Sequence, residues 1–383
     1  MRTPVPAIRR VIVTGVSVVG VSVISVPLLI AGTAVAAAPV TASAAMTRTM
    51  PGRPAASTAI SGQLSGVAAT SARNAWAVGS TRSAHPGTLI MHWNGTRWRR
   101  VSSPGPAGST LHGVAATSGR NAWAVGSTGT GKALILHWNG TTWRRVTSPG
   151  DGLSGVAATS ARNAWAVGST SSAKTLIVHW NGRTWKRVAS PSPSRARFST
   201  LAAVTATSAH SAWAVGSTSA GTSFKSLILR WNGRAWKQVP SPSVKFGRFG
   251  NALEGVAATS AANAWAVGCT DDCPVGGTPL IERWSGTSWK QVAAPTTPYA
   301  IYNLAGVAAT SASSAWTVGS GGPVTSEAAA TARWNGHRWT LSHGRSGAGL
   351  TAVAAVSATN AWAVGGTVKG RTLILHWNGT AWK

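Results

Sequence analysis

The sequence predicts an all-β fold, a seven-bladed β-propeller of four-stranded antiparallel blades, and three observations support this. One motif, which reads NAWAVGSTGTGKALILHWNGTTWRRVTSPG at residues 121–150, occurs seven times without interruption. All 21 tryptophans belong to it, three per copy, and the first tryptophans of successive copies are 42 to 52 residues apart. This period is typical of repeat architectures. Each copy also holds four short strand-like runs separated by turn residues, as one propeller blade requires.

The tryptophans fall into three sets by their place in the motif. The first set is Trp76, Trp123, Trp165, Trp213, Trp265, Trp316 and Trp362. The second set is Trp93, Trp138, Trp180, Trp231, Trp284, Trp334 and Trp377, and the third is Trp98, Trp143, Trp185, Trp236, Trp289, Trp339 and Trp382. Burial of one such side chain contributes about 4–6 kcal/mol of gross hydrophobic free energy. We therefore expect the tryptophans to be structural and to pack one blade against the next.

The second copy shows how each strand is assigned. Its strands are predicted at 111–117, 122–126, 134–138 and 142–146, and the first of these, with the run GVAAT, has the small side chains that an innermost strand needs. The pair Asn139-Gly140 predicts a two-residue type I′ turn between the third and fourth strands. Such a turn places Leu136 opposite Trp143, so that Trp138 and Trp143 would meet diagonally.

The N-terminal 63 residues precede the repeats. Residues 1–44 are predicted to be a signal peptide, because Arg2, Arg9 and Arg10 precede a long apolar run and A-x-A cleavage sites end at Ala36 and Ala44. The run is also long enough to remain as an uncleaved anchor. The expected localisation is secreted or at the cell surface.

Residues 45–63 are predicted to be a linker, and the propeller to span 64–383. Its blades are expected to begin near Leu64, Leu111, Leu153, Leu201, Leu253, Leu304 and Leu350. The last copy stops at Trp382-Lys383, where the other copies continue into an outer strand. We expect the stretch Met46–Met50 to supply that strand and close the ring; a truncated sequence is the alternative.

The runs AWAVG and HWNGTxW, repeated over residues 64–383, resemble those of secreted bacterial seven-bladed β-propeller repeat proteins related to BNR/Asp-box and Ycf48-like propellers. This resemblance implies the propeller fold and export. The Asp-box pattern SxDxGxTW is only partly met, because Asn139 stands in place of the aspartate. The departure argues against a sialidase.

The charge is strongly positive, with 35 lysines and arginines against six acidic residues and a net charge of +29. Such a surface attracts polyanions. Many cations follow the third tryptophan of a copy: Arg99, Arg100, Arg144, Arg145, Lys186, Arg187, Lys237 and Lys290. Charged side chains on an outer edge strand prevent aggregation, so this pattern favours rim charge over a dedicated nucleic-acid site.

The chemistry-bearing residues predict no enzyme and no cofactor. The acidic residues are Asp151, Glu254, Asp271, Asp272, Glu282 and Glu327, too few and too scattered for the paired carboxylates of a glycosidase. One repeat position holds His92, His137, His179 and His376 in four copies and Arg230, Arg283 and Arg333 in three. Arginine does not ligate metal ions, so we expect this position to be structural and predict no metal site.

Cys269 and Cys273 are the two cysteines. In an exported chain they are expected to form a local disulfide, with a Cys/Asp metal site as the alternative.

The variable loops are the candidate binding surface. The connections from second to third strand and from fourth strand to the next blade vary most, and both lie on one face of a propeller. The candidate ligand-binding residues are the aromatic Phe198, Phe224, Phe246, Phe249, Tyr299 and Tyr302 and the basic Arg195, Arg197, Lys225, Lys245 and Arg248. Loops on a rigid scaffold often carry binding residues; alternatively, each aromatic residue fastens its own loop.

The sequence as a whole predicts a monomeric, non-enzymatic binding or scaffold protein that meets a protein or a cell-wall glycan or polyanion through the loop face of blades four to six. Membrane contact is expected only through the N-terminal signal. The first alternative is a lectin with sugars held between blades against the repeated tryptophans, and the second is a degenerate Asp-box hydrolase.

Overall fold

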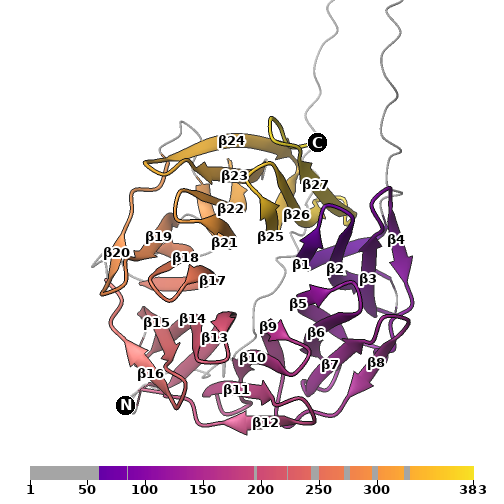
Figure 1. Cartoon of the computed structure of the whole chain (residues 1–383), viewed down its shortest axis with the longest axis horizontal. Helices are drawn as coiled ribbons and strands as arrows, with labels where there is room; N and C mark the ends of the chain where they lie inside the picture. The colour runs from indigo at the N-terminus through magenta and orange to yellow at the C-terminus, as the bar shows by residue number, and fades with distance from the viewer. Residues whose placement is uncertain are drawn as a thin grey trace, which may run out of the picture. The chain divides into compact units, whose positions relative to one another are not determined.

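The computed structural model describes residues 60–383 except 84, 194–195, 222, 243–249, 271–276, 296–300 and 323–327, with only the backbone described at 301–302 and 342–345. Within these residues 27 strands form seven antiparallel sheets arranged as blades around a central axis (Figure 1). In every sheet the strands lie side by side in chain order, the first innermost. The predicted seven-bladed β-propeller is confirmed.

The two inner strands of each blade are long. The innermost strands are β1 (Gly62–Ser71), β5 (Thr110–Ser118), β9 (Leu153–Ser160), β13 (Phe198–Ser208), β17 (Asn251–Ser260), β21 (Ile301–Ser311) and β25 (Ala348–Ser357). The second strands are β2 (Asn74–Thr81), β6 (Asn121–Ser127), β10 (Asn163–Ser169), β14 (Ser211–Ser219), β18 (Asn263–Thr270), β22 (Ser314–Gly321) and β26 (Asn360–Thr367).

The two outer strands complete the blades. The third strands are β3 (Thr88–Trp93), β7 (Ala133–Trp138), β11 (Thr175–Trp180), β15 (Phe224–Trp231), β19 (Thr278–Trp284), β23 (Ala328–Trp334) and β27 (Thr372–Trp377). The outermost strands are β4 (Trp98–Val101), β8 (Trp143–Val146), β12 (Trp185–Val188), β16 (Trp236–Val239), β20 (Trp289–Gln291) and β24 (Trp339–Ser346). In the second blade every predicted strand end lies within one residue of the observed one.

The predicted two-residue turn between the third and fourth strands is wrong. Trp138 pairs directly with Trp143, and Leu136 pairs with Arg145, so the loop has four residues. The Asn139 side chain closes this loop, because its Oδ1 accepts hydrogen bonds from the backbone N–H groups of Thr141 and Thr142, each at 3.0 Å. Only Gly140 has a positive φ, at 102°, whereas a type I′ turn needs two such residues.

The small residues of the innermost strands allow neighbouring blades to touch near the axis. A Cβ atom on Gly66 would lie 2.9 Å from the carbonyl oxygen of His112 and 3.1 Å from the Cα of Gly113 in the next blade. Gly113 stands in the same relation to Gly155. Backbone therefore packs on backbone around the axis, and a larger side chain at these positions would push the blades apart.

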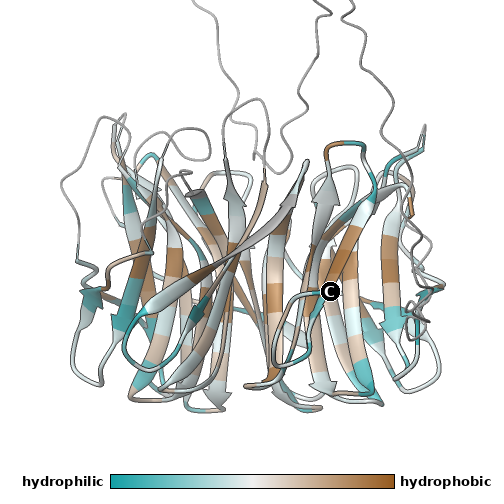
Figure 2. Ribbon diagram, turned by 90° about the horizontal axis from the view of Figure 1, so that it is seen from above, coloured by the Kyte–Doolittle hydropathy of each residue, from teal (hydrophilic) through white to brown (hydrophobic). Residues whose placement is uncertain are grey.

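The tryptophans pack between blades. Trp76 of blade one is buried, and its ring centroid lies 4.9 Å from that of Trp138 and 5.1 Å from that of Trp143, both in blade two. The same arrangement recurs around the ring, in apolar clusters that each combine two blades. Hydrophobic residues lie mostly in the middle of the strands, and hydrophilic ones mostly towards the strand ends and loops (Figure 2).

The ring closes through this packing as well. Trp362 of blade seven lies 4.9 Å from Trp93 and 5.1 Å from Trp98 of blade one, and Thr351 Oγ1 donates to the carbonyl oxygen of Leu64 at 2.7 Å. Blade seven has three full strands, and its fourth is reduced to a single bridge between Trp377 and Trp382. The stretch Met46–Met50, predicted to supply this strand, lies outside the described residues.

The residues just before the first blade also contact the last. Ser61 pairs with Arg371, and Gly62 N–H donates to the carbonyl oxygen of Gly370 at 2.9 Å. Among the described residues, no helix is long and apolar enough to cross a membrane.

Candidate binding sites

The structure describes part of the predicted loop site. Arg197, Phe198, Phe224 and Lys225 are described, and Tyr302 is described in its backbone only, within β21. Six further predicted residues lie outside the described residues: Arg195, Lys245, Phe246, Arg248, Phe249 and Tyr299.

Phe198 and Phe224 meet at the loop end of blade four. Phe198 pairs with Ser219 on one side of β14, and Phe224 pairs with Ser219 on the other. The two rings approach edge to face, with centroids 6.1 Å apart and planes at 90°, an arrangement that aromatic pairs favour. The Phe224 side chain is 40% exposed, and Arg197 and Lys225 beside the pair are exposed. The edge of blade four therefore presents aromatic surface on one face of the sheet, and its adjacent residues Arg197 and Lys225 add positive charge at the same end of the blade.

The repeat position that holds histidine or arginine stacks on the buried tryptophan of its own blade. The ring of His92 lies 4.1 Å from that of Trp76, nearly parallel to it. His92 Nε2 lies 2.9 Å from Asn74 Oδ1, and Asn74 Nδ2 donates to Thr70 Oγ1 at 2.7 Å. His137 and His179 repeat these contacts, and His376 repeats the stacking. Burial lowers the pKa of all four histidines, so their rings are neutral at pH 7.

Arginine at this position reaches further than histidine. The guanidinium carbon of Arg230 lies 5.0 Å from the Trp213 ring of its own blade and 5.2 Å from the Trp284 ring of the next. Arg283 and Arg333 bridge two tryptophans in the same way. The sequence shows that both residue types share this position. The contact of arginine with the next blade is not visible in the sequence, because it depends on how the blades are arranged.

The described acidic side chains do not form a catalytic pair. Asp151 accepts from Ser171 N–H at 2.7 Å and from Lys132 Nζ at 2.9 Å, and these contacts lower its pKa. Glu282 is fully buried in β19; its Oε1 accepts from Ser241 Oγ at 2.8 Å, its Oε2 has no described partner, and burial raises its pKa to about 7. A carboxyl group in that position cannot face a substrate.

Glu254 lies on the innermost strand β17, with β18 between it and Glu282. Surrounding protein raises the pKa of its carboxyl group, whereas the side chain is exposed and its contact with water limits that effect. The other acidic residues, Asp271, Asp272 and Glu327, lie outside the described residues.

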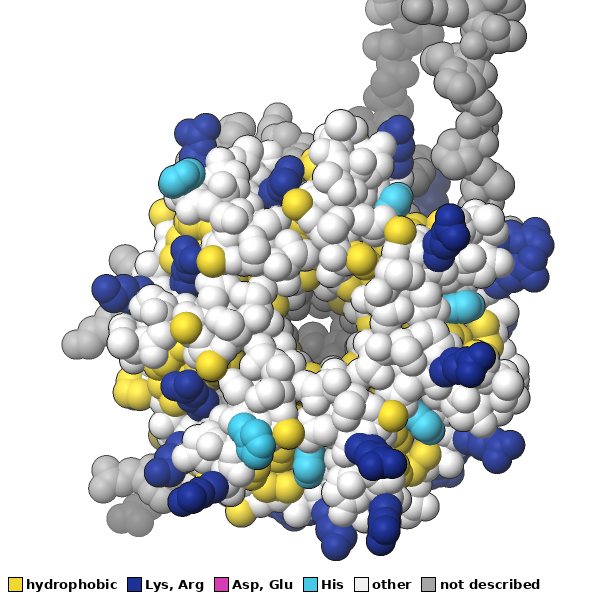
Figure 3. Space-filling model, viewed as in Figure 1, with side chains coloured by type: hydrophobic (Ala, Val, Ile, Leu, Met, Phe, Trp, Pro, Cys, Tyr) yellow, Lys and Arg dark blue, Asp and Glu magenta, His cyan; other side chains and the backbone are white. Residues whose placement is uncertain are grey.

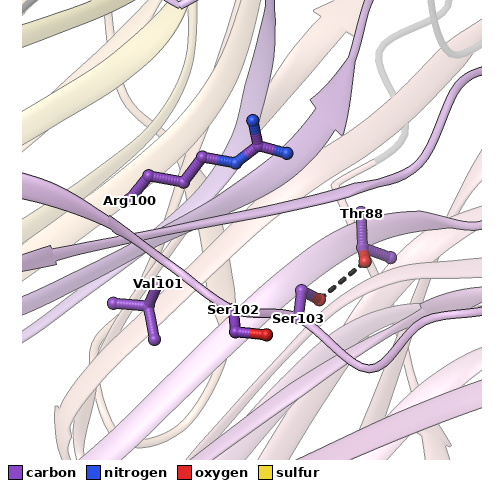
Figure 4. A pocket seen from close by; sticks show the side chains of 5 residues that line it. All are labelled: Thr88, Arg100, Val101, Ser102 and Ser103. Atoms are coloured by element: carbon purple, nitrogen blue, oxygen red, sulfur yellow. Dashed lines mark hydrogen bonds between the residues drawn. The ribbon is translucent and has the colours of Figure 1, made fainter.

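A hollow of about 430 Å³ lies at the outer edge of blade one (Figure 4). Thr88, Arg100, Val101, Ser102 and Ser103 line it. Thr88 Oγ1 and Ser103 Oγ share a hydrogen bond of 2.6 Å, and in blade three Thr175 bonds Ser190 and Ser192 in the same way. The hydroxyl groups thus fasten the outer connection to the third strand, and no histidine or carboxylate lines the hollow to activate them.

The described part of the chain includes Cys269 and most of the histidines. No group of three histidine, cysteine, aspartate or glutamate side chains lies together there as a metal site would require. Cys269 is disulfide-bonded; its predicted partner, Cys273, lies outside the described residues.

Comparisons with known proteins show the fold. No family model matches the sequence, and no curated protein matches it. Among solved structures, the chain is similar to the BP39L lectin from Burkholderia pseudomallei, with a TM-score of 0.58 and 12% identity over 85% of this chain and 98% of the lectin. It is similar to YCF48 bound to D1 peptide, with a TM-score of 0.56 and 14% identity over 85% of this chain and 97% of that one.

A third similar structure is the β-propeller domain of the Trilobed protease from Pyrococcus furiosus, described as having an open velcro topology. Its TM-score is 0.55 at 8% identity, over 85% of this chain and 97% of that one. At these identities the likeness shows the propeller fold alone.

Proposed function

We propose that the protein is a secreted, non-enzymatic binding or scaffold module of the bacterial cell surface, whose partner meets the loop face of blades four to six. The partner is an acidic protein segment or a polyanionic glycan. The observation that carries the proposal is the edge-to-face pair of half-buried Phe198 and exposed Phe224, each followed or preceded in the chain by an exposed basic residue, Arg197 or Lys225.

The surroundings of this pair support a binding role. Most tryptophans are buried in blade packing, whereas Phe224 leaves 40% of its surface in solvent at the end of a rigid sheet. Loops held by a rigid scaffold commonly carry binding residues, and phenylalanine is among the residues enriched in interfaces. The net charge of +29 favours and accelerates encounters with acidic partners. A propeller of the same fold, YCF48, has been solved bound to a peptide.

Calorimetric titration with acidic peptides that contain aromatic residues, and with purified teichoic acid, tests this function. We expect one site per chain, weakened by about tenfold or more in Phe224→Ala, because interface hot spots are aromatic anchors. Val368, the other large exposed apolar residue of the described part of the chain, lies on blade seven and supplies the control, Val368→Ala. Equal binding by wild type and Phe224→Ala would refute the loop site.

A second candidate, a lectin, is favoured by one observation. Trp93, Trp138, Trp180 and Trp231 are only half-buried, so part of each indole is accessible to a ligand, and the apolar face of a sugar ring is a suitable partner for it. The similarity of fold to a lectin is consistent with this use. Binding stoichiometry separates the candidates, since the loop face provides one site and the tryptophans provide several equivalent ones.

A further inference from the structure

Blades one to four differ systematically from blades five to seven on the face that carries the short turns. These turns join the first strand to the second and the third to the fourth. Three features change together between the two groups of blades: the residue stacked on the buried tryptophan at each interface, the exposure of the next blade's second-set tryptophan, and the charge of the first turn.

The first two features are linked by the length of one side chain. His376, His92, His137 and His179 stand before Trp93, Trp138, Trp180 and Trp231 respectively, and those four tryptophans are half-buried. At the other three interfaces Arg230, Arg283 and Arg333 lie over Trp284, Trp334 and Trp377, which are only 4%, 6% and 8% exposed. Imidazole stays on its own blade's tryptophan, whereas guanidinium covers the neighbour's indole as well. We call the four interfaces with a half-buried second-set tryptophan open and the three with a buried one closed.

The third feature is a basic residue beside each open tryptophan. Trp93 Nε1 donates to the carbonyl oxygen of Ala72 at 3.0 Å, and the next residue, Arg73, packs over Gly95 of the adjacent turn. Arg120, Arg162 and His210 hold the same place in blades two to four. Blades five to seven have the neutral residues Ala262, Ser313 and Thr359 there.

The contacts of arginine at a closed interface show which chemical groups fit beside the second-set tryptophan. The guanidinium of Arg283 stacks on Trp265 at 4.9 Å and on Trp334 at 5.6 Å. It also donates to the carbonyl oxygen of Ala312 at 3.1 Å, which already accepts from Trp334 Nε1. The space thus takes a group that has a flat face for the indole and a donor for the turn carbonyl. At an open interface a bound molecule can supply both.

The surrounding charge selects an anion. Among the described residues, the short-turn face shows lysine, arginine and histidine side chains around its circumference and no aspartate or glutamate (Figure 3). A ligand with a carboxylate would meet an arginine of the first turn at three of the open sites and His210, a hydrogen-bond donor, at the fourth.

We propose that the four open interfaces are equivalent sites for an acidic glycan. Each sugar ring packs its apolar face on Trp93, Trp138, Trp180 or Trp231, its hydroxyl groups donate to the turn carbonyl, and its carboxylate pairs with the basic turn residue. This proposal rests on the second proposed function, lectin binding, and specifies the class of sugar and the residues that meet it at the four tryptophans. Four linked sites bind a polymer far more tightly than one site binds a single sugar.

Replacing the four histidines by arginine, the residue that covers the tryptophan at the closed interfaces, provides the test. A variant with His92→Arg, His137→Arg, His179→Arg and His376→Arg copies the arrangement that already exists at three interfaces, so it is expected to fold. Loss of one aromatic stacking contact weakens binding by about threefold to tenfold. Across four linked sites we expect the variant to lose at least about a hundredfold in affinity for an oligomer of galacturonic acid. Since the variant is also more positive, attraction by charge alone predicts tighter binding, and that result would overturn the proposal.

Two controls separate the remaining explanations. Arg283→His combined with Ser313→Arg gives the interface at Trp334 both an uncovered indole and a basic turn residue, and we expect its binding stoichiometry for short galacturonate oligomers to rise above that of the wild type. Inorganic polyphosphate has charge but no sugar face, so equal competition by polyphosphate would refute stacking. A neutral galactose oligomer that binds the four sites equally well refutes the acidic specificity and leaves the lectin function standing, whereas no binding of any glycan refutes both. Val368→Ala, an exposed apolar residue outside these interfaces, should leave all these titrations unchanged.

Discussion

Glu282 provides a direct test of how the interface between blades four and five is built. Its carboxyl group is fully buried on β19, with one hydrogen bond from Ser241 and a second oxygen that has no described partner. The equivalent residues of other blades include Leu136, Leu229 and Leu375. A titratable group thus stands at a place that the fold otherwise fills with a hydrocarbon side chain.

Burial makes this group a source of pH-dependent stability. Its pKa is about 7 in the folded protein, against 4.5 ordinarily, so between these values the folded state holds a proton that the unfolded state has released. The free energy of unfolding therefore falls as the pH rises from 4.5 through 7 and levels off above 7. The difference between the two pKa values corresponds to about 3 kcal/mol, at about 1.4 kcal/mol per pH unit.

Glu282→Gln isolates the effect, because glutamine keeps an acceptor for Ser241 and cannot ionise. We expect the variant to match the wild type near pH 4.5 and to exceed it by about 3 kcal/mol at pH 8. Glu282→Leu should behave alike, since replacing a buried charge by a hydrocarbon is commonly stabilising. Urea unfolding of the three proteins at pH 4.5, 6, 7 and 8 provides the measurement. A wild-type advantage that grows with pH would mean that a cation pairs with the carboxylate, and the reasoning would fail.

Three further predictions concern stability. Gly126→Ala should destabilise by about 3 kcal/mol or more in thermal unfolding, because the new Cβ would lie 2.0 Å from the Thr110 carbonyl oxygen; Gly221→Ala, with nothing within 4 Å, is the control. Burial lowers the pKa of His92, His137, His179 and His376, so the unfolded state takes up protons first and the free energy of unfolding should fall as the pH drops below about 6.5. In urea unfolding over the same pH range, the fourfold histidine-to-arginine variant should lose less. Asp151→Asn should lower the free energy of unfolding by at most about 1 kcal/mol at pH 7, because its Lys132 partner is largely exposed. A larger loss in urea unfolding would contradict the view that Asp151 contributes only a surface ion pair and one loop hydrogen bond.

The fold was predictable because its signals are local and repeated. The tryptophan spacing, the four runs per copy and the small residues of the first run each predict a blade independently, and they agree. The hairpin register was predicted wrongly because the sequence pair Asn139-Gly140 has two uses. The Asn139 side chain caps a four-residue loop here, and that competes with the shorter turn the same pair favours elsewhere.

The candidate sites were less predictable, for a geometric reason. Loop residues such as Phe198 and Phe224 stood out as exceptions in a regular sequence, and their edge-to-face contact follows from sharing the neighbour Ser219. The open and closed interfaces depend instead on residues that lie in different copies of the repeat, such as Arg230 and Trp284. Sequence spacing within one copy does not reveal which side chain covers the next blade's tryptophan.

The seven interfaces share their tryptophans and differ in the side chain that stacks on them. All seven interfaces contain the same three tryptophans, so the tryptophans alone cannot distinguish a binding interface from a structural one. The distinguishing residue is the side chain stacked on the buried indole, because its length determines whether the neighbouring indole is covered. Histidine and arginine both stabilise the interface by stacking, so the exchange changes accessibility while leaving the packing of the blades intact. One substitution at this position therefore covers or uncovers an indole, and under the proposed glycan binding the basic residue of the first turn is a second, separate requirement.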